Sequence, residues 1–213
     1  MRTSIYIDGF NLYYGCVKRT RYRWLDVAAF CQAMLLPRNQ ITRIRYFTAW
    51  VKPRPDDPQQ LQRQQAYVRA LQTIPNLTVH FGHYLEYETR MPLANPAPNG
   101  PRTVAVMKTE EKGSDVNLAT HLLLDGFNGD YEMAVVVSND SDLLEPIRVV
   151  RKRFRLGVGV INPHHDKISW ALKKMATFYN QFDPVLRPNL LQNCQLPKTL
   201  KDAQGTITKP SSW

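Results

Sequence analysis

Five segments of the chain have the composition of β-strands, because each is a short run rich in β-branched and aromatic residues with turn-forming residues near its ends. One of them, EMAVVVS at 132–138, is an almost uninterrupted apolar run, which is typical of a parallel strand covered on both faces. We therefore expect this strand at the centre of a sheet. The predicted strands are residues 3–8, 41–51, 76–86, 132–138 and 155–161.

Between these runs, apolar residues recur at spacings of three and four, which indicates amphipathic helices. The broadest apolar face belongs to SDVNLATHLLLDGF at 114–127. The alternation of strands and helices implies a doubly wound α/β fold with a mainly parallel, five-stranded sheet and right-handed crossovers. The predicted helices are residues 9–18, 27–36, 59–72, 114–127, 142–154 and 165–179.

Two segments depart from this alternation. Residues 88–102 are rich in proline and predict a flexible insertion, and the extended stretch 102–112 could pair with the residues before it. From residue 181 the pattern decays into a basic, proline-rich sequence, which we expect to be poorly structured or to wrap around the domain. The expected organisation is a domain of residues 1–180 and a tail of residues 181–213. The insertion and the tail could each shape or cover a substrate groove, or mediate self-association into a homodimer.

The chain is basic, with 28 Lys and Arg against 18 Asp and Glu, a formal net charge of +10. Its long-range field therefore favours polyanionic partners such as nucleic acid or an anionic membrane surface. No stretch approaches the ~18 uncharged apolar residues of a membrane span, and the N-terminus has no signal-peptide core, so we expect a cytoplasmic protein without a membrane segment.

The three cysteines lack the spacing of a zinc site, and Cys16 and Cys31 are predicted core residues.

Four aspartates are expected at one edge of the sheet, where ligands of open α/β sheets bind beyond the carboxyl ends of the strands. Asp8 ends the first strand, Asp140 and Asp142 follow the central strand in SNDSD, and Asp115 begins a helix. Each could simply cap a helix, since Asp is favoured at helix N-termini. One helix start needs one cap, however, and two carboxylates two residues apart repel unless a positive charge lies between them. A divalent metal ion is the simplest source of that positive charge.

Mg²⁺ or Mn²⁺ fits such a group, because both ions prefer carboxylate, water and phosphate oxygens as ligands. A metal held in this way polarises a phosphate and lowers the pKa of a bound water, so that the water can attack in line. The residues alone therefore indicate metal-dependent chemistry on a phosphate. The basic residues would hold the polyanion, although the run at 151–155 is equally explained by the helix dipole. The candidate nucleic-acid contacts are Arg19, Arg21, Arg23, Arg43, Arg45, Arg151 and Arg153.

Two further features have both a functional and a structural interpretation. Tyr22 and Trp24 stand among arginines and could stack on unpaired bases, but packing in the core is favoured. His164 and His165 follow the last predicted strand, near the edge that carries the aspartates. A role in a surface loop is favoured for them over a substrate contact.

Three blocks of the sequence resemble the NYN domain, a PIN-like nuclease family of the LabA type. The blocks are IDGFNLYYG at 7–15, EEKGSDVNLATHLLLD at 110–125 and AVVVSNDSDLLEPI at 134–147. With the elements between them they span residues 1–180, and their combination is specific although each block alone is weak. The resemblance implies a Rossmann-like sheet of PIN type and a metal-dependent endoribonuclease that hydrolyses RNA phosphodiester bonds.

The resemblance also implies roles for the four aspartates, all of which become candidate catalytic residues. Asp8, Asp115 and Asp140 are expected to bind Mg²⁺ or Mn²⁺ directly or through water, and Asp142 to act behind them or at a second metal. RNA is the implied partner. DNA stays an alternative substrate, because nothing in the sequence visibly reads a 2′-hydroxyl.

Four polar residues are expected to orient ligands or to bind substrate. Asn11 and Ser138 match polar positions that flank the site, and we place Asn139 and Lys112 in the same group.

Other functions fit the same residues less well. A haloacid-dehalogenase-type phosphatase needs a second aspartate two residues after the first, where this chain has Phe10, and a dinucleotide-binding turn needs three glycines where IDGFN has one. The main rival is a non-catalytic protein that binds RNA or a partner on a PIN-like scaffold. Four carboxylates favour catalysis, because a pure binding module has no reason to place like charges where phosphates must approach.

Overall fold

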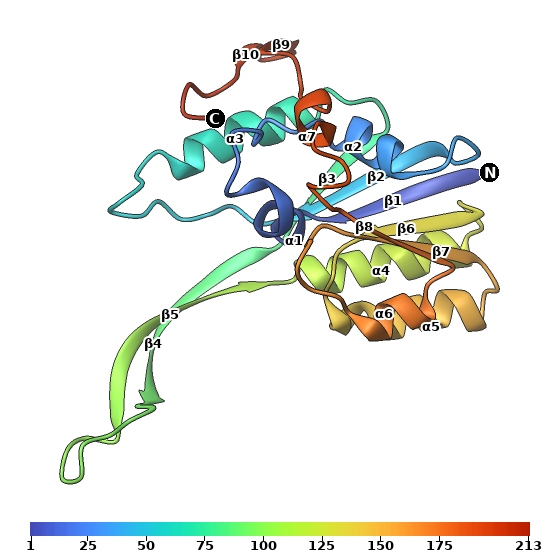
Figure 1. The fold of residues 1–213 in the computed structure, drawn as a ribbon. Helices are drawn as coiled ribbons and strands as arrows, with labels where there is room; N and C mark the ends of the chain where they lie inside the picture. Colours follow the sequence, from blue (N-terminus) through green and yellow to red (C-terminus); the bar gives the residue numbers. More distant parts are fainter.

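Six strands form one sheet, and every neighbouring pair in it is parallel. In the computed structural model, which describes all 213 residues, the strand order is β3-β2-β1-β6-β7-β8 (Figure 1). The chain therefore winds outward from β1 in one direction and then returns to build the other half of the sheet from β6. The strands are β1 (Arg2–Asp8), β2 (Gln40–Thr48), β3 (Leu77–Phe81), β6 (Met133–Val137), β7 (Gly157–Asn162) and β8 (Phe178–Gln181).

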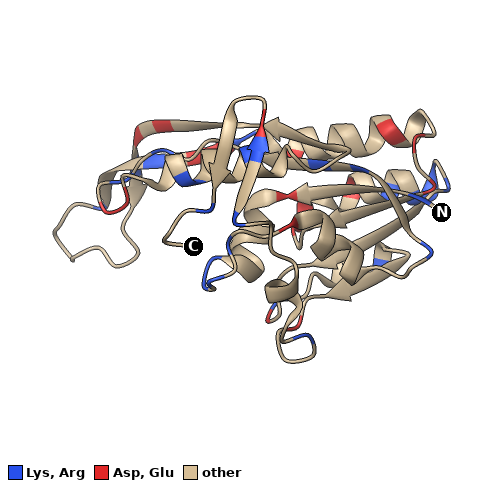
Figure 2. Ribbon diagram, turned by 90° about the horizontal axis from the view of Figure 1, so that it is seen from above, with Lys and Arg blue, Asp and Glu red and all other residues tan.

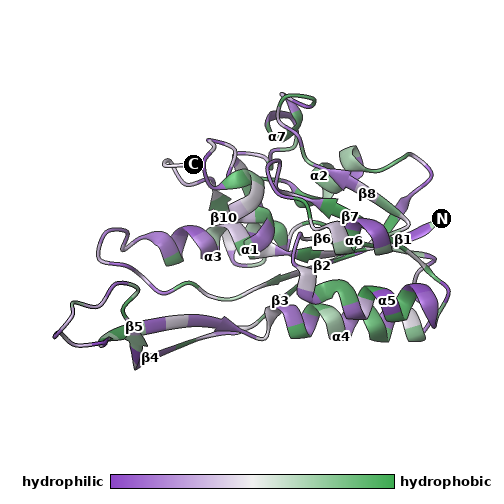
Figure 3. Cartoon of the chain, turned by 60° about the horizontal axis from the view of Figure 1, so that its bottom comes forward, coloured by the Kyte–Doolittle hydropathy of each residue, from purple (hydrophilic) through white to green (hydrophobic).

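Helices cover both faces of this sheet, as the α/β prediction requires (Figure 1). One layer contains α1 (Gly9–Leu12), which continues into a π-helical turn (Tyr13–Val17), with α2 (Val27–Met34) and α3 (Gln60–Leu71). The other contains α4 (Ser114–Phe127), a 3₁₀ turn (Ser141–Leu143) leading into α5 (Leu144–Lys152), and α6 (Trp170–Met175). In Figure 3, α4 and α5 carry both green and purple surfaces, as helices packed on one side against a sheet do. None of the helices combines the length and hydropathy that a bilayer crossing requires.

Two hydrophobic cores result, one on each face of the sheet. Along β6, Val135 and Val137 pack into the core under α1 and α2, whereas Ala134 and Val136 pack into the core under α4 and α5. All five residues of β6 are buried, which confirms the prediction that EMAVVVS is a central strand covered on both faces.

The sheet has one strand more than the sequence predicts. Residues 165–179 were expected to form a single helix, but α6 ends at Met175 and the chain then turns back along the free edge of β7. Thr177 fixes this turn, because its backbone N–H donates to the Val158 carbonyl (2.6 Å) and its hydroxyl accepts from the Val158 N–H (2.9 Å). The unpaired backbone groups of β7 thus override the helical spacing of the sequence.

The predicted insertion at residues 88–102 forms the tip of a β-hairpin. Strand β4 (His83–Pro92) pairs antiparallel with β5 (Thr103–Lys112), and the two form an arm that projects from the sheet, joined by the loop 93–102 (Figure 1). The predicted strand 76–86 is split at Gly82 between β3 and this arm. A Cβ at Gly82 would lie 2.5 Å from the Lys112 carbonyl oxygen, so only glycine lets the two strands cross at the root of the arm.

Residues 181–213 are ordered and wrap around the core, which is the second of the two alternatives expected for the tail. The segment contains α7 (Leu190–Asn193) and a hairpin of β9 (Thr199–Asp202) and β10 (Gly205–Thr208). Its apolar residues Cys194, Leu196 and Ile207 are buried in the core under α2. Asp202 accepts two hydrogen bonds from Arg69 of α3 (3.0 and 2.7 Å), and the Trp24 indole donates to the Pro197 carbonyl (2.8 Å).

Candidate active site

The winding direction of the chain reverses between β1 and β6. These two strands are neighbours in the sheet, but the chain leaves β1 toward β2 and leaves β6 toward β7. In open α/β sheets this reversal opens a crevice at the carboxyl ends of the two strands, which is where ligands bind. Asp8 closes β1 at this crevice, and Ser138, Asn139 and Asp140 directly follow β6.

Asp8 is buried, with 6% of its surface exposed. One carboxylate oxygen accepts the Asn11 backbone N–H (2.9 Å), which caps α1, and the other accepts the Ser138 hydroxyl (3.1 Å). The pKa of the Asp8 carboxyl is raised to about 6, mainly by burial and also by the neighbouring Asp115 and Asp140 carboxylates, against the lowering effect of these two hydrogen bonds. The site is therefore short of positive charge around Asp8.

Asp140 and Asp115 complete a cluster drawn from three parts of the chain. The Asp140 N–H donates to Ser138 Oγ (3.1 Å), and Asp140 Oδ1 accepts the Asp142 N–H (2.9 Å) as a helix cap, while Oδ2 accepts no hydrogen bond from the protein. Asp115 lies in the first turn of α4. Burial raises the pKa of Asp115, and the charges of Asp140, Glu111 and Asp142 add to the shift. Capping thus accounts for one oxygen of Asp8 and one of Asp140, but not for the placement of Asp115 and Asp140 near enough to Asp8 to raise its pKa.

Asn11, Asn139 and His164 form a second layer of polar contacts beside this cluster. Asn11 Oδ1 accepts the Asn139 backbone N–H (3.0 Å) and lies 3.2 Å from His164 Nε2, which places the ring proton on that nitrogen. Burial lowers the pKa of His164, and Lys167 lowers it further, so the ring is neutral at pH 7. Asn139 Oδ1 in turn accepts from the Ser169 N–H (2.9 Å) and the Tyr179 hydroxyl (3.2 Å). These contacts hold the loops after β1, β6 and β7 together.

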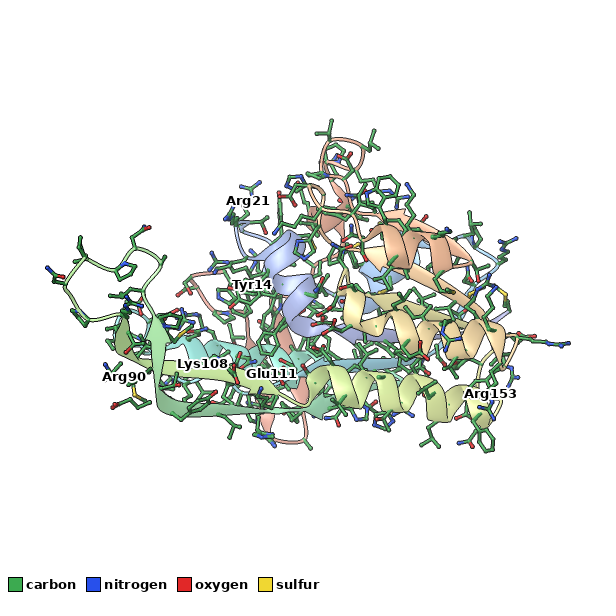
Figure 4. The ribbon with its side chains drawn as sticks, turned by 90° about the horizontal axis from the view of Figure 1, so that it is seen from below. Tyr14, Arg21, Arg90, Lys108, Glu111 and Arg153 are labelled. Atoms are coloured by element: carbon green, nitrogen blue, oxygen red, sulfur yellow. The ribbon has the colours of Figure 1, made fainter.

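Two of the residues near the carboxylates were not among the predicted site residues. His164 follows β7 at the same edge of the sheet, and this position in the sequence was the available signal. Glu111, at the root of the arm, accepts the Ser114 N–H and hydroxyl (3.1 and 2.7 Å) and so caps α4 (Figure 4). Lys112, which was predicted to contact substrate, is instead exposed and paired with Glu110 (2.9 Å).

The structure does not bring most of the predicted basic contacts to the site. Arg153 lies at the end of the molecule opposite the arm, because α5 runs antiparallel to the strands and ends at their amino edge (Figure 4). Arg151 is beside it and donates to the Met175 carbonyl (3.2 Å). Arg43 and Arg45 are paired with Asp130 and Asp125. Lys and Arg are spread over several faces of the molecule instead of forming one stripe (Figure 2).

Three of the predicted basic residues lie on the segment that follows the π-helical turn. Arg19 and Arg21 are exposed, and Arg21 rests over the Tyr22 ring at 5.3 Å. Arg23 lines a cavity beside Gly9. Trp24 is fully buried, which confirms that it packs in the core.

The chemistry of the donor set fits a hard divalent cation. Asp8, Asp115, Asp140 and Glu111 supply only oxygen ligands, and their mutual repulsion is what a cation relieves. No group of three or more His, Cys, Asp or Glu side chains is arranged to hold a metal ion in this structure. A bound cation would therefore have to draw the carboxylates closer together, with water filling the remaining positions.

Comparison with known proteins bears directly on this site. The chain matches the NYN domain model over residues 2–182, a range that contains every residue of the carboxylate cluster. It belongs to the NYN domain family. NYN domains have a nuclease-like fold of PIN type and typically use divalent metal ions, so the family resemblance expected from the three sequence blocks is confirmed.

Two proteins similar to this NYN protein differ in what they indicate. Over its whole length the chain is 30% identical to 6-hydroxy-3-succinoylpyridine 3-monooxygenase of Pseudomonas putida, and it covers 75% of that protein. A crystal structure of a protein of unknown function from Vibrio parahaemolyticus has a similar fold, with a TM-score of 0.51 and 17% identity, over 85% of this chain and 93% of that one. The similarity to the Vibrio parahaemolyticus structure concerns the fold alone.

Proposed function

We propose that this NYN domain hydrolyses RNA phosphodiester bonds with Mg²⁺ or Mn²⁺ held by Asp8, Asp115 and Asp140. The observation that carries the proposal is that Asp8 and Asp140 are joined through Ser138 where the sheet reverses its winding, and that burial together with the nearby charges of Asp115 and Asp140 raises the pKa of Asp8 to about 6. Like charges of this kind are costly in a folded protein unless a cation binds between them. They are also the ligands that phosphoryl-transfer metals prefer.

The metal, when bound, polarises the phosphate and lowers the pKa of an attacking water. The protein's own residues hold the ligands in place. Ser138 donates to Asp8 through its hydroxyl while it accepts the Asp140 N–H, so that one side chain sets the distance between two ligands. Asn11 ties the loop after β1 to the loop after β6, and neutral His164 fixes the orientation of the Asn11 amide. Asp142 is exposed beside Asp140, where it could bind a second cation.

The test is a cleavage assay with single-stranded RNA, structured RNA and DNA of the same sequence, each with Mg²⁺, Mn²⁺ or chelator. We expect cleavage of RNA that requires metal and falls by at least ~10²-fold in Asp140→Asn, because this change removes a metal ligand. Glu88→Gln, an exposed carboxylate on the arm, is the matched control and is expected to leave the rate unchanged. Cleavage that survives chelation would refute the proposal. Tight, metal-independent RNA binding without cleavage would favour the non-catalytic rival.

A second candidate function follows from the relative in Pseudomonas putida. That protein is named a monooxygenase acting on a substituted pyridine, and its match extends over the whole chain, including the residues beyond the NYN match. A cavity of a size suited to a small molecule begins at Gly9, the residue after Asp8. We infer oxygenation of a small aromatic acid as the alternative activity. Hydroxylation of 6-hydroxy-3-succinoylpyridine with O₂ and a nicotinamide reductant, in the absence of RNA cleavage, would establish it.

A further inference from the structure

A cavity of about 210 Å³ lies between α1, the π-helical turn, the end of β2 and the start of α3. It is larger than the roughly 150 Å³ cavity that accommodates benzene, so one substituted aromatic ring fits. No residue of the carboxylate cluster lines it. The cavity is therefore a separate site, which we call the tyrosine pocket. Its aromatic lining consists of Phe10, Tyr13, Tyr14, Tyr46, Tyr67 and Trp213.

The aromatic walls of the tyrosine pocket are held in place by their own contacts. The Tyr67 hydroxyl donates to the Leu25 carbonyl (2.8 Å), and the Tyr67 ring meets Trp213 edge to face with centroids 5.7 Å apart. Tyr13 and Tyr14 meet at 5.3 Å and 77°. Rigid aromatic faces of this kind bind planar rings by stacking at little entropic cost.

Cations line the same pocket in excess. Four cationic side chains and two carboxylates line it: Lys18, Arg23, Arg54 and Arg63, against Asp56 and Asp57. Of the four cations only Arg63 forms an ion pair, with Asp57. Lys18 lies over the Tyr14 ring at 4.6 Å.

Arg23 supplies a further indication of a missing partner. Its Nε is buried and makes no hydrogen bond. A buried donor without an acceptor is destabilising, and an anionic ligand would satisfy it.

The tyrosine pocket begins one residue from the active-site carboxylate. Gly9 directly follows Asp8 and lines the pocket floor against Tyr46. A Cβ at Gly9 would lie 2.7 Å from the Tyr46 ring and hydroxyl, so glycine is required for this close contact. A ligand in the pocket would therefore lie next to the carboxylate cluster.

We propose that the tyrosine pocket binds a planar aromatic ring that carries an anionic group. The ring stacks on the tyrosines, and the anion pairs with Arg23 and Arg54. A nucleotide of a bound nucleic acid and a free aromatic carboxylate both have this chemistry. The inference rests on the pocket itself and does not depend on RNA cleavage.

The test is calorimetric titration of the full chain in chelator, so that metal at Asp8 plays no part. The ligands are matched pairs that differ in the anion: adenosine 5′-monophosphate against adenosine, and pyridine-3-carboxylate against the corresponding amide. We expect one-to-one binding of at least one anion, with the neutral partner weaker by about 10-fold or more, since a charge-assisted hydrogen bond is lost. Binding of the monophosphate alone identifies a nucleotide site, and binding of the carboxylate alone identifies a site for a free aromatic acid.

Variants show whether binding occurs in the tyrosine pocket. Arg54→Ala and Tyr14→Ala change exposed side chains and are each expected to weaken binding by about 10-fold. Arg90→Ala and Tyr87→Ala on the arm are the matched controls and should have no effect. The Asp8→Asn variant should bind the same ligands as the native protein. Loss of cleavage without loss of binding would then separate this inference from the proposed cleavage. Absence of binding by all four ligands, or binding that is insensitive to Arg54 and Tyr14, would overturn the proposal.

Discussion

Asp8→Asn is expected to reduce metal-dependent RNA cleavage by about 10³-fold, or roughly 4 kcal/mol of transition-state stabilisation, and at the same time to stabilise the metal-free protein at pH 8. The substitution is nearly isosteric. An asparagine oxygen still accepts the Asn11 N–H, and its amide can donate to Ser138 Oγ. What is lost is the buried negative charge, which is the proposed ligand for the metal and also the source of repulsion from Asp115 and Asp140.

The stabilisation has a defined pH dependence. The pKa of Asp8 is about 6 in the folded protein, above its ordinary value of 3.8, so folding is favoured by the bound proton below pH 4 and loses this contribution as the pH rises through 6. About two pKa units correspond to roughly 3 kcal/mol. Asn at this position carries no charge, so the variant should gain stability over the native protein between about pH 4 and pH 6 and reach a plateau above about pH 7.

Thermal unfolding in chelator at several pH values measures this difference, with Glu88→Gln as the control that should follow the native curve. Addition of Mn²⁺ should raise the melting temperature of the native protein and not that of Asp8→Asn, because only a folded, charged site binds the ion. A variant that is less stable than the native protein at pH 8 would show that the Asp8 charge is compensated within the chain. The carboxylate cluster would then have no need of a cation.

Asp125→Ala is expected to lower the free energy of unfolding by about 3–5 kcal/mol, because it leaves a largely buried arginine without its partner. Asp125 in α4 is 2% exposed and accepts two hydrogen bonds from Arg45 (2.8 and 2.9 Å) and one from the Tyr6 hydroxyl (2.7 Å). These contacts attach α4 to β1 and β2. Since α4 also carries Asp115, the cluster should lose its geometry when they are removed.

Urea denaturation measures this effect. Asp130→Ala is the matched control, since its pair with Arg43 is partly exposed and is expected to contribute less than 1 kcal/mol. Replacing Arg45 and Asp125 together by apolar residues should recover much of the loss, because no charge then remains buried alone. A loss below 1 kcal/mol for Asp125→Ala would show that water or Arg43 compensates for the missing carboxylate.

The elements that the sequence predicted correctly are those in which local pattern and tertiary environment agree. The apolar run of β6 is buried on both faces, and α4 spans the predicted residues 114–127. Asp8 and Asp140 were identifiable because each follows a strong strand signal, and the carboxyl ends of adjacent parallel strands meet at one edge of the sheet.

The features that were missed depend on partners far away in the sequence. Strand β8 forms because β7 offers an open edge, although residues 165–179 have helical spacing on their own. Arg45 was a plausible phosphate contact until the structure paired it with Asp125, 80 residues later. Trp213 reaches Tyr67 only because the hairpin of β9 and β10 packs on α3 through Asp202. Local periodicity contains no information about any of these pairings.

The most direct test of the metal site is an anomalous difference map from a crystal of this protein soaked in Mn²⁺, beside the same experiment on Asp8→Asn. The account predicts a strong peak in the crevice between β1 and β6, within about 2.6 Å of carboxylate oxygens of Asp8 and Asp140, and no peak there in the variant. A native crystal without a peak at this position, grown from protein that cleaves RNA in the same Mn²⁺ buffer, would contradict it.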